Sequence, residues 1–251
     1  MKIPVPQYAP LLRTTAIEVI YIYETMTLKH YTAFNFGAVI PILGVKIPGF
    51  TFETGVSGSI FSRFELFSES FNFVTADFMG GGYAAVESGS FIIDISVYHI
   101  SSHAGDDYVL YDNGSIVNTG YEAARLIAAW NTSEWFSCSL GTEYRFHRSP
   151  ERTVFYISSF MAEGRLDFLH FGIPIFLECD IELVDWYRYV NVGARIGVYT
   201  RYLFNSVILG RQDQGRQCHE FSITYYYGFS KALYFERTRE SLVLMGPTYR
   251  Y

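Results

Sequence analysis

His99 and Ser101 have the residue types and the spacing that nucleophilic catalysis requires. They stand near the end of the run SFIIDISVYHISSHAGDD (90–107), in which apolar and polar residues alternate. Such alternation predicts a strand, and residues two apart on a strand share one face at roughly 6.6 to 7 Å. We therefore expect the imidazole of His99 to reach the hydroxyl of Ser101, as a general base reaches a nucleophile.

Glu122 is expected to complete this pair from the next strand. In an antiparallel pair the two residue numbers sum to a constant, so pairing of Ser101 with Gly120 would place His99 opposite Glu122. A slip of one residue would instead turn Glu122 to the other face. With the first register, Ser101 is the nucleophile, His99 the base and Glu122 the carboxylate that orients the base.

The elements that must position these residues are short strands of period two. We expect about ten to twelve of them, joined mostly by hairpin-length breaks, which favours an all-β fold: an antiparallel transmembrane up-and-down β-barrel. The predicted organisation is an extended, proline-containing lead-in over 1–12, a barrel over 13–235 and a C-terminal tail over 236–251.

Two segments leave room for another assignment. The run YEAARLIAAWN (121–131) has helix-forming residues, but its neighbours and its short length favour a strand. Gly80, Gly81 and Gly82 follow a predicted strand over 70–79, and three glycines in succession are typical of a turn or a bulge. We expect the strand to break there.

Composition favours a barrel in a membrane. Aromatic residues make up 18% of the 251 residues and charged residues only 18%, and many Tyr and Phe suit the outer band and girdles of a membrane barrel. No apolar run approaches the roughly 20 residues of a membrane-spanning helix. Charged residues also fall on the faces predicted to point inward, which a dry soluble core would not tolerate unpaired: Arg63, Glu65, Asp94, Arg125, Glu143 and Arg145.

The expected surroundings follow from the same features. A bacterial outer membrane is the expected location and membrane lipids are the expected partners, while a net charge of −6 argues against nucleic acid. Residues 1–10 lack the apolar core and cleavage site of a signal peptide, so we expect a mature or truncated chain. The oligomeric state is left open.

The His-x-Ser pattern at a strand end resembles the lipid-facing sites of outer-membrane phospholipase A and lipid A deacylase. The resemblance implies a lipid-ester hydrolase whose third member is Glu122 or, as alternatives, Asn113 or Asn118. Ser102 stands where both of those families have Asn.

A larger part of the chain resembles the bacterial outer-membrane barrel family designated domain of unknown function 1207. The similar segments are YHISSHAGDDYVLY (98–111), YEAARL (121–126) and GRQCHEFSITYYYGF (215–229). That family is longer than this chain. The resemblance implies an outer-membrane barrel and no established activity.

Other interpretations compete with catalysis. His, Ser and Asp are ordinary residues at a barrel rim, so the chain is expected to be a structural or pore-forming barrel, with lipid-ester hydrolysis as the alternative. A metal site is a third hypothesis, in which His99, His103, Asp106 and Asp107 would be ligands. Calcium, the one cofactor considered, prefers oxygen and would suit Asp106 and Asp107 best.

Overall fold

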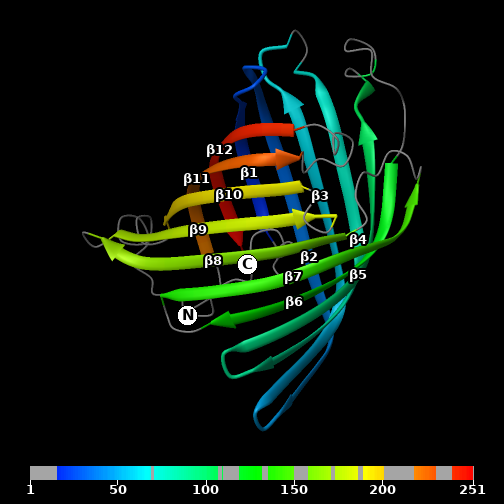
Figure 1. Ribbon diagram of the computed structural model, residues 1–251, viewed down its shortest axis with the longest axis vertical. Coiled ribbons are helices and arrows are strands. Elements are labelled where there is room, and N and C mark those ends of the chain that lie inside the picture. Colours follow the sequence, from blue (N-terminus) through cyan, green and yellow to red (C-terminus); the bar gives the residue numbers. More distant parts are fainter. Residues whose placement is uncertain are drawn as a thin grey trace.

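A computed structural model describes residues 16–68, 71–106, 109, 119–131, 135–149, 158–170, 173–185, 189–200, 218–229 and 239–250. In it, twelve antiparallel strands close into a barrel in which each strand pairs with its neighbours in sequence and the last pairs with the first (Figure 1). The strands are β1 Ala16–Glu24, β2 Lys29–Ile47, β3 Phe50–Glu65, β4 Phe73–Ser88, β5 Phe91–Ala104, β6 Thr119–Asn131, β7 Phe136–Ser149, β8 Ser158–His170, β9 Ile173–Val184, β10 Tyr189–Tyr199, β11 Cys218–Phe229 and β12 Arg239–Arg250. The predicted all-β barrel is confirmed.

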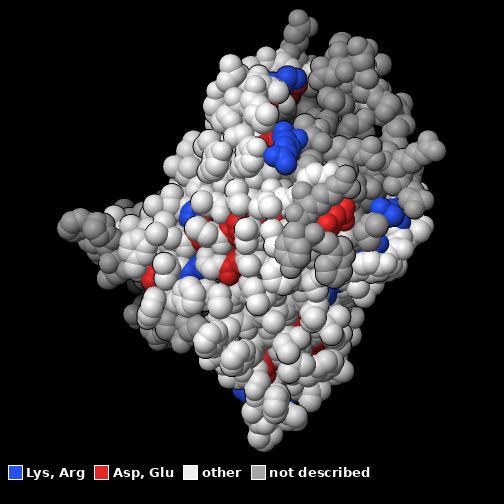
Figure 2. Space-filling model, in the orientation of Figure 1, with Lys and Arg blue, Asp and Glu red and all other residues white. Residues whose placement is uncertain are grey.

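Strand β5 shows how the alternation builds the wall. Ile93, Ile95 and Val97 point outward and are 51 to 53% exposed, whereas Asp94 and Ser96 point inward and are almost fully buried. The same division holds across the sheet, so the outside of the barrel is largely apolar. Figure 2 shows that most of the described surface on one face carries neither acidic nor basic side chains.

Two boundaries differ from those predicted. Strand β4 runs without a break through Gly80, Gly81 and Gly82, because all three pair with β5 in an uninterrupted register. The inward position of Gly81 is too close to the side chain of Tyr98 for a Cβ, so glycine there admits the tyrosine. The barrel also extends past residue 235: β12 lies in the predicted tail and closes the sheet against β1. The predicted lead-in lies outside the described residues.

The segment 121–131 is a strand, as predicted, and belongs to β6. No helix in the described ranges is long and apolar enough to cross a membrane.

The described charged side chains of the barrel interior form buried ion pairs. Arg165 pairs with Glu178 at 3.3 Å and with Glu220 at 3.4 Å, and Arg195 pairs with Glu220 at 3.3 Å. Arg63 pairs with Glu240 at 2.6 Å. The predicted inward charges include three arginines that are paired with carboxylates: Arg63 with Glu240, and Arg125 and Arg145 with Glu143.

Candidate functional site

The register of β5 and β6 brings the predicted residues together. His99 lies opposite Glu122, and Ser101 lies opposite Gly120. His99 belongs to the outward row of β5 that begins with the apolar residues, and its side chain is 54% exposed, whereas the Glu122 side chain is 32% exposed. The pair therefore lies on the outer wall of the barrel, close to the end of β5 at Ala104.

Glu122 holds the imidazole of His99 through a hydrogen bond. His99 Nδ1 lies 2.9 Å from Glu122 Oε1. An ionised carboxylate only accepts hydrogen bonds, so Nδ1 carries the proton, and the second ring nitrogen of a neutral imidazole is then free to accept one. This is the arrangement in which a histidine acts as a base through Nε2 while a carboxylate fixes its tautomer.

A second histidine binds the same carboxylate from the other side. His147 Nδ1 on β7 hydrogen-bonds to Glu122 Oε2, and the His147 side chain is 65% exposed. Glu122 therefore lies between two imidazoles, each held by one of its oxygens. Both contacts restrict the rotation of the carboxylate, because its two oxygens are engaged in opposite directions.

A bulge in β7 places His147 on the outer wall. Glu143 and Arg145 point inward, so a regular strand would also turn residue 147 inward. The register shifts between Glu122 and Ala123, which face His147 and Arg145, so Phe146 is an extra residue on β7. A bulge re-aims the side chains that follow it. Here both Phe146 and His147 lie on the outside.

Ser101 lies opposite a glycine on β6. Gly120 has no side chain and is buried, and His99 Cε1 lies only 3.5 Å from where a Cβ on Gly120 would be. The His99 ring thus leans over Gly120, next to Ser101. Across the other edge of β5, His99 faces Gly80, which has open space on its outward side. Gly120 therefore accommodates the His99 ring, and Gly80 leaves room for a ligand beside it.

Ser101 and His99 do not share a hydrogen bond in the described structure. Catalytic hydrogen bonds are often long or misaligned before substrate binds. The shared outward face and the free second nitrogen of His99 are the features that permit the contact. Of the two contacts that the predicted set requires, the structure contains one, the His99–Glu122 hydrogen bond, and Ser101 shares the outward face with His99.

The inner side of the wall behind the site is tightly packed. Tyr98, Ile100, Tyr121 and Ala123 form a buried cluster between β5 and β6. The Tyr98 hydroxyl donates a hydrogen bond to Glu143, which also pairs with Arg125 at 2.6 Å, and Arg125 lies 4.9 Å from the Tyr98 ring centroid. A site needs such a rigid supporting layer to keep its reacting groups in place.

The other predicted residues are not brought into the site. Ser102 points into the barrel and is fully buried, 3.3 Å from the Thr75 hydroxyl, so its side chain cannot serve a ligand on the outer wall. His103 packs edge-on against Phe78, with ring centroids 5.7 Å apart. Asp106 is exposed. Asp107, Asn113 and Asn118 lie outside the described residues.

The described part of the chain contains no cluster of metal-ligating side chains. No group of three or more His, Cys, Asp or Glu residues there is arranged to hold an ion. Calcium takes six to eight oxygen ligands, and Asp106 alone does not supply them.

Sequence reasoning missed His147, because simple alternation assigns it to the interior and only the bulge reverses this. The pairing of Gly120 with Ser101 was expected from the sequence and is confirmed.

Comparisons with known proteins agree with the fold. Outer membrane phospholipase A from Escherichia coli has a TM-score of 0.59 at 12% identity over 95% of this chain and 90% of that chain. The Salmonella typhi outer membrane phospholipase dimer with bound calcium has a TM-score of 0.63 at 12% identity over 94% and 90% of the two chains. At this identity the likeness shows a shared barrel fold. No curated protein matches the sequence.

The segments 98–111, 121–126 and 215–229 indicated a particular family from the sequence alone, and that resemblance is confirmed over nearly the whole chain. The match covers residues 11–251, from before β1 to the end of β12. The chain belongs to the family described as Protein of unknown function (DUF1207).

Proposed function

We propose that the barrel spans a bacterial outer membrane. Every strand contributes an outward apolar side chain that is 39 to 55% exposed: Val19, Phe34, Ile60, Phe78, Ile95, Leu126, Leu140, Phe160, Leu177, Ile196, Ile223 and Met245. A soluble monomer rarely exposes a continuous apolar patch larger than a few hundred Å². A lipid-facing band around a closed barrel accounts for this belt.

The height of the wall supports a site at the membrane boundary. Phe91 stacks on Trp130 at one end of the barrel, with ring centroids 5.6 Å apart, as aromatic residues do at membrane interfaces. Eight positions along β5 separate Phe91 from His99, or about 26 Å of strand. At a tilt of about 40° this is roughly 20 Å along the membrane normal, close to the apolar height of such barrels.

We further propose that the protein hydrolyses an ester of a membrane lipid. The observation that carries this proposal is the Nδ1 contact of His99 with Glu122 on the outer wall, beside Ser101 and the open position at Gly80. A lipid embedded next to the barrel would present its ester at this height. The phospholipases with the same fold act from a barrel too, which makes the activity compatible with the architecture.

The proposed reaction has two steps, acylation of Ser101 and hydrolysis of the acyl-serine. Ser101 Oγ forms a bond to the acyl carbon while His99 Nε2 takes the serine proton and then gives it to the departing alkoxide. Water then attacks the acyl carbon of the acyl-serine, and a water proton passes to His99. The bond between this carbon and Ser101 Oγ breaks, His99 returns the proton to Ser101 Oγ, and the fatty acid leaves. Glu122 stays ionised, keeps the imidazole oriented and stabilises it while it is charged.

The buried interior disfavours the pore-forming alternative. Inward charged side chains would be well exposed in a water-filled channel, yet those of Arg165, Glu178 and Glu220 are at most 4% exposed. A purely structural barrel is the second candidate, since it needs none of the outer-wall contacts around Glu122.

Calcium stays a prediction from the sequence. Asp106 is exposed five positions beyond Ser101, and the described residues provide no complete site. Adding a chelator to the purified protein tests whether activity depends on calcium, and no step of the proposed reaction requires it.

The deciding experiment compares wild-type protein with Ser101→Ala in detergent micelles. Release of fatty acid from dipalmitoyl phosphatidylcholine and from lipid A is measured with and without calcium. We expect turnover by the wild type and a fall to background in the variant, with heat-modifiable gel migration showing that both are folded. Absence of turnover by the wild type, or equal turnover by both, would leave the structural barrel as the function.

A further inference from the structure

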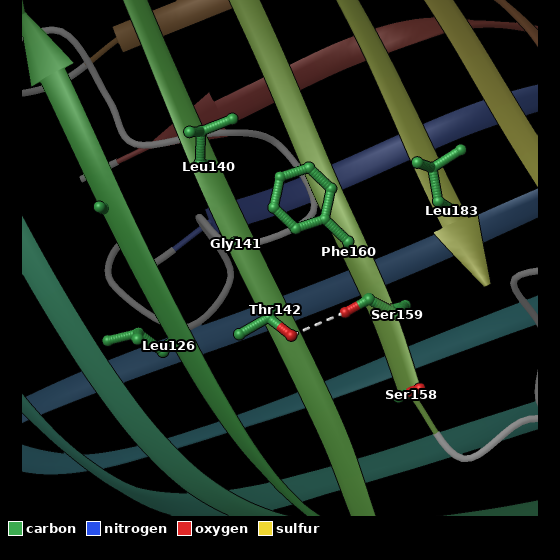
Figure 3. A pocket seen from close by; sticks show the side chains of 9 residues that line it. Leu126, Leu140, Gly141, Thr142, Ser158, Ser159, Phe160 and Leu183 are labelled. Atoms are coloured by element: carbon green, nitrogen blue, oxygen red, sulfur yellow. Dashed lines mark hydrogen bonds between the residues drawn. The ribbon is translucent and has the colours of Figure 1, made fainter. Parts of the chain in front are cut away.

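A groove of about 430 Å³ crosses the outer wall beside the candidate site (Figure 3). Its centre is one level row of paired positions on four neighbouring strands. Leu126 on β6 pairs with Thr142 on β7, Thr142 with Phe160 on β8, and Phe160 with Leu183 on β9. Ala128 and Leu140 form the adjacent level. The groove is therefore built into the regular sheet and does not depend on a loop.

The lining of the groove is mostly apolar and carries no charge, with Thr142, Ser158 and Ser159 as its polar residues. Thr142 is the polar residue of the central row, and its hydroxyl donates to the backbone oxygen of Ser159 at 3.0 Å, as Figure 3 shows. Because this hydroxyl is bonded to the backbone of the barrel wall, Thr142 presents its methyl group to the groove. Ala128, which pairs with Leu140, adds little bulk to the groove beside the larger side chains of Leu140 and Phe160.

The groove lies on the membrane-buried side of the candidate site. Leu126 shares the outward row of β6 with Glu122 and is four positions away, about 13 Å along the strand. Ala124 lies between them on the same row, and its small side chain does not obstruct the surface from Glu122 to Leu126. One leaflet of the hydrocarbon core is about 15 Å thick, so the groove is at the depth of the distal part of an acyl chain whose ester is near Ser101.

We propose that this groove binds an acyl chain of the lipid whose ester is held at Ser101. The inference rests on the proposed function and adds a substrate class to it: lipids with long acyl chains. Acyl chains are the occupant that fits, because the groove opens on the belt proposed to face lipid and has no charged lining residue. A short chain would end at Ala124 and gain nothing from the groove.

The test fills the groove with a bulky side chain. Ala128→Trp is compared with Ala84→Trp, which adds the same bulk to the outward row of β4, away from the groove. Hydrolysis of dipalmitoyl and dihexanoyl phosphatidylcholine is measured for both variants and for the wild type. We expect Ala128→Trp to lower kcat/KM for the dipalmitoyl lipid by about 10-fold, equal to about 1.4 kcal/mol, with little change for the dihexanoyl lipid.

A second measurement works without turnover. A phosphatidylcholine with a photoreactive diazirine at the end of one palmitoyl chain is crosslinked to the protein in vesicles. We expect more label on Leu140 and Phe160 than on Ile93 and Ile95, and loss of that excess in Ala128→Trp.

The outcomes separate the two proposals. If the wild type hydrolyses neither lipid, the proposed function fails. Equal crosslinking to Leu140, Phe160, Ile93 and Ile95 would then overturn the groove proposal as well. If the wild type is active but Ala128→Trp treats both lipids as the wild type does, the hydrolase stands and the groove does not bind the chain.

Discussion

His147 and Glu122 face each other across a bulge that turns His147 from the inside of the barrel to the outside. If β7 were regular, with Phe146 paired like its neighbours, His147 would point inward and Glu122 would have one imidazole partner. With it, each oxygen of the carboxylate binds one histidine. Glu122 is therefore held in a fixed orientation toward His99, and His147 is a positioning residue in the proposed reaction.

Replacing His147 tests this role. We expect His147→Ala to lower kcat for dipalmitoyl phosphatidylcholine by about 10-fold with little change in KM, because the base loses orientation while the lipid contacts remain. His147→Gln retains an N–H donor and should recover part of the rate. His30→Ala removes an imidazole on β2 that hydrogen-bonds to Tyr21 and serves as the control. A rate for His147→Ala equal to that of the wild type would remove the positioning role.

Deleting Phe146 gives a sharper test of the geometry. Arg145 already faces Ala123 and His147 already faces Glu122, so removal of the intervening residue leaves a regular ladder with His147 still outward. We expect this deletion to preserve kcat within about threefold, or about 0.7 kcal/mol. A loss as large as that of His147→Ala would mean that the bulge itself shapes the site. Retained heat-modifiable migration shows that the shortened strand still assembles.

Much of the fold could be predicted because alternate residues of a strand in a closed antiparallel barrel face the outside and the inside, and the sequence alternates accordingly. The alternation places the odd-numbered residues from Phe91 to Val97 on one face, and the structure shows that this face is the outside. The His99 to Glu122 register was likewise available, since antiparallel pairing fixes all partners once one pair is chosen. Bulges and long-range closure carry no such local pattern, which is why His147 and β12 were missed.

Ile95 and Ser96 test the face assignment with one kind of substitution. We expect Ile95→Asp to destabilise the barrel, by less than the roughly 2 to 4 kcal/mol that an Arg or Lys costs at the bilayer midplane. Ser96→Asp points inward and lies opposite Arg125, so the new carboxylate has a cation nearby and assembly should proceed. The measurement is the folded fraction in lipid vesicles by heat-modifiable migration. Equal yields for the two variants would show that the outer wall does not face lipid.

The buried ion network in the interior should contribute to stability far more than an exposed pair. Arg165→Ala removes one of the two arginines that pair with Glu178 and Glu220 and leaves Arg195 to serve both carboxylates. Breaking a buried pair costs about 3 to 5 kcal/mol, and the remaining arginine places this variant toward the lower end of that range. Lys29→Ala breaks a partly exposed pair with Glu65, 3.1 Å long, and should cost about 1 kcal/mol or less. Urea unfolding in lipid vesicles compares the two. Similar midpoints for both variants would mean that water reaches the interior network.

Glu122 gives the most direct test of the proposed reaction. Glu122→Ala removes the acceptor of His99 Nδ1, so the imidazole loses both its tautomer and its orientation, and kcat should fall by roughly 10²- to 10⁴-fold. Glu122→Gln can still accept the Nδ1 proton through its amide oxygen but lacks the charge that stabilises the imidazolium, so its rate should be intermediate.

The double variant Ser101→Ala with Glu122→Ala then decides whether these residues act as a unit. Groups that work in one step have strongly non-additive effects, so no further loss is expected beyond that of Ser101→Ala alone. If the two losses multiply, Glu122 affects the rate through the stability of the wall and not through His99. The free energy of unfolding of Glu122→Ala distinguishes these cases independently, because an exposed outer-wall carboxylate should change it little.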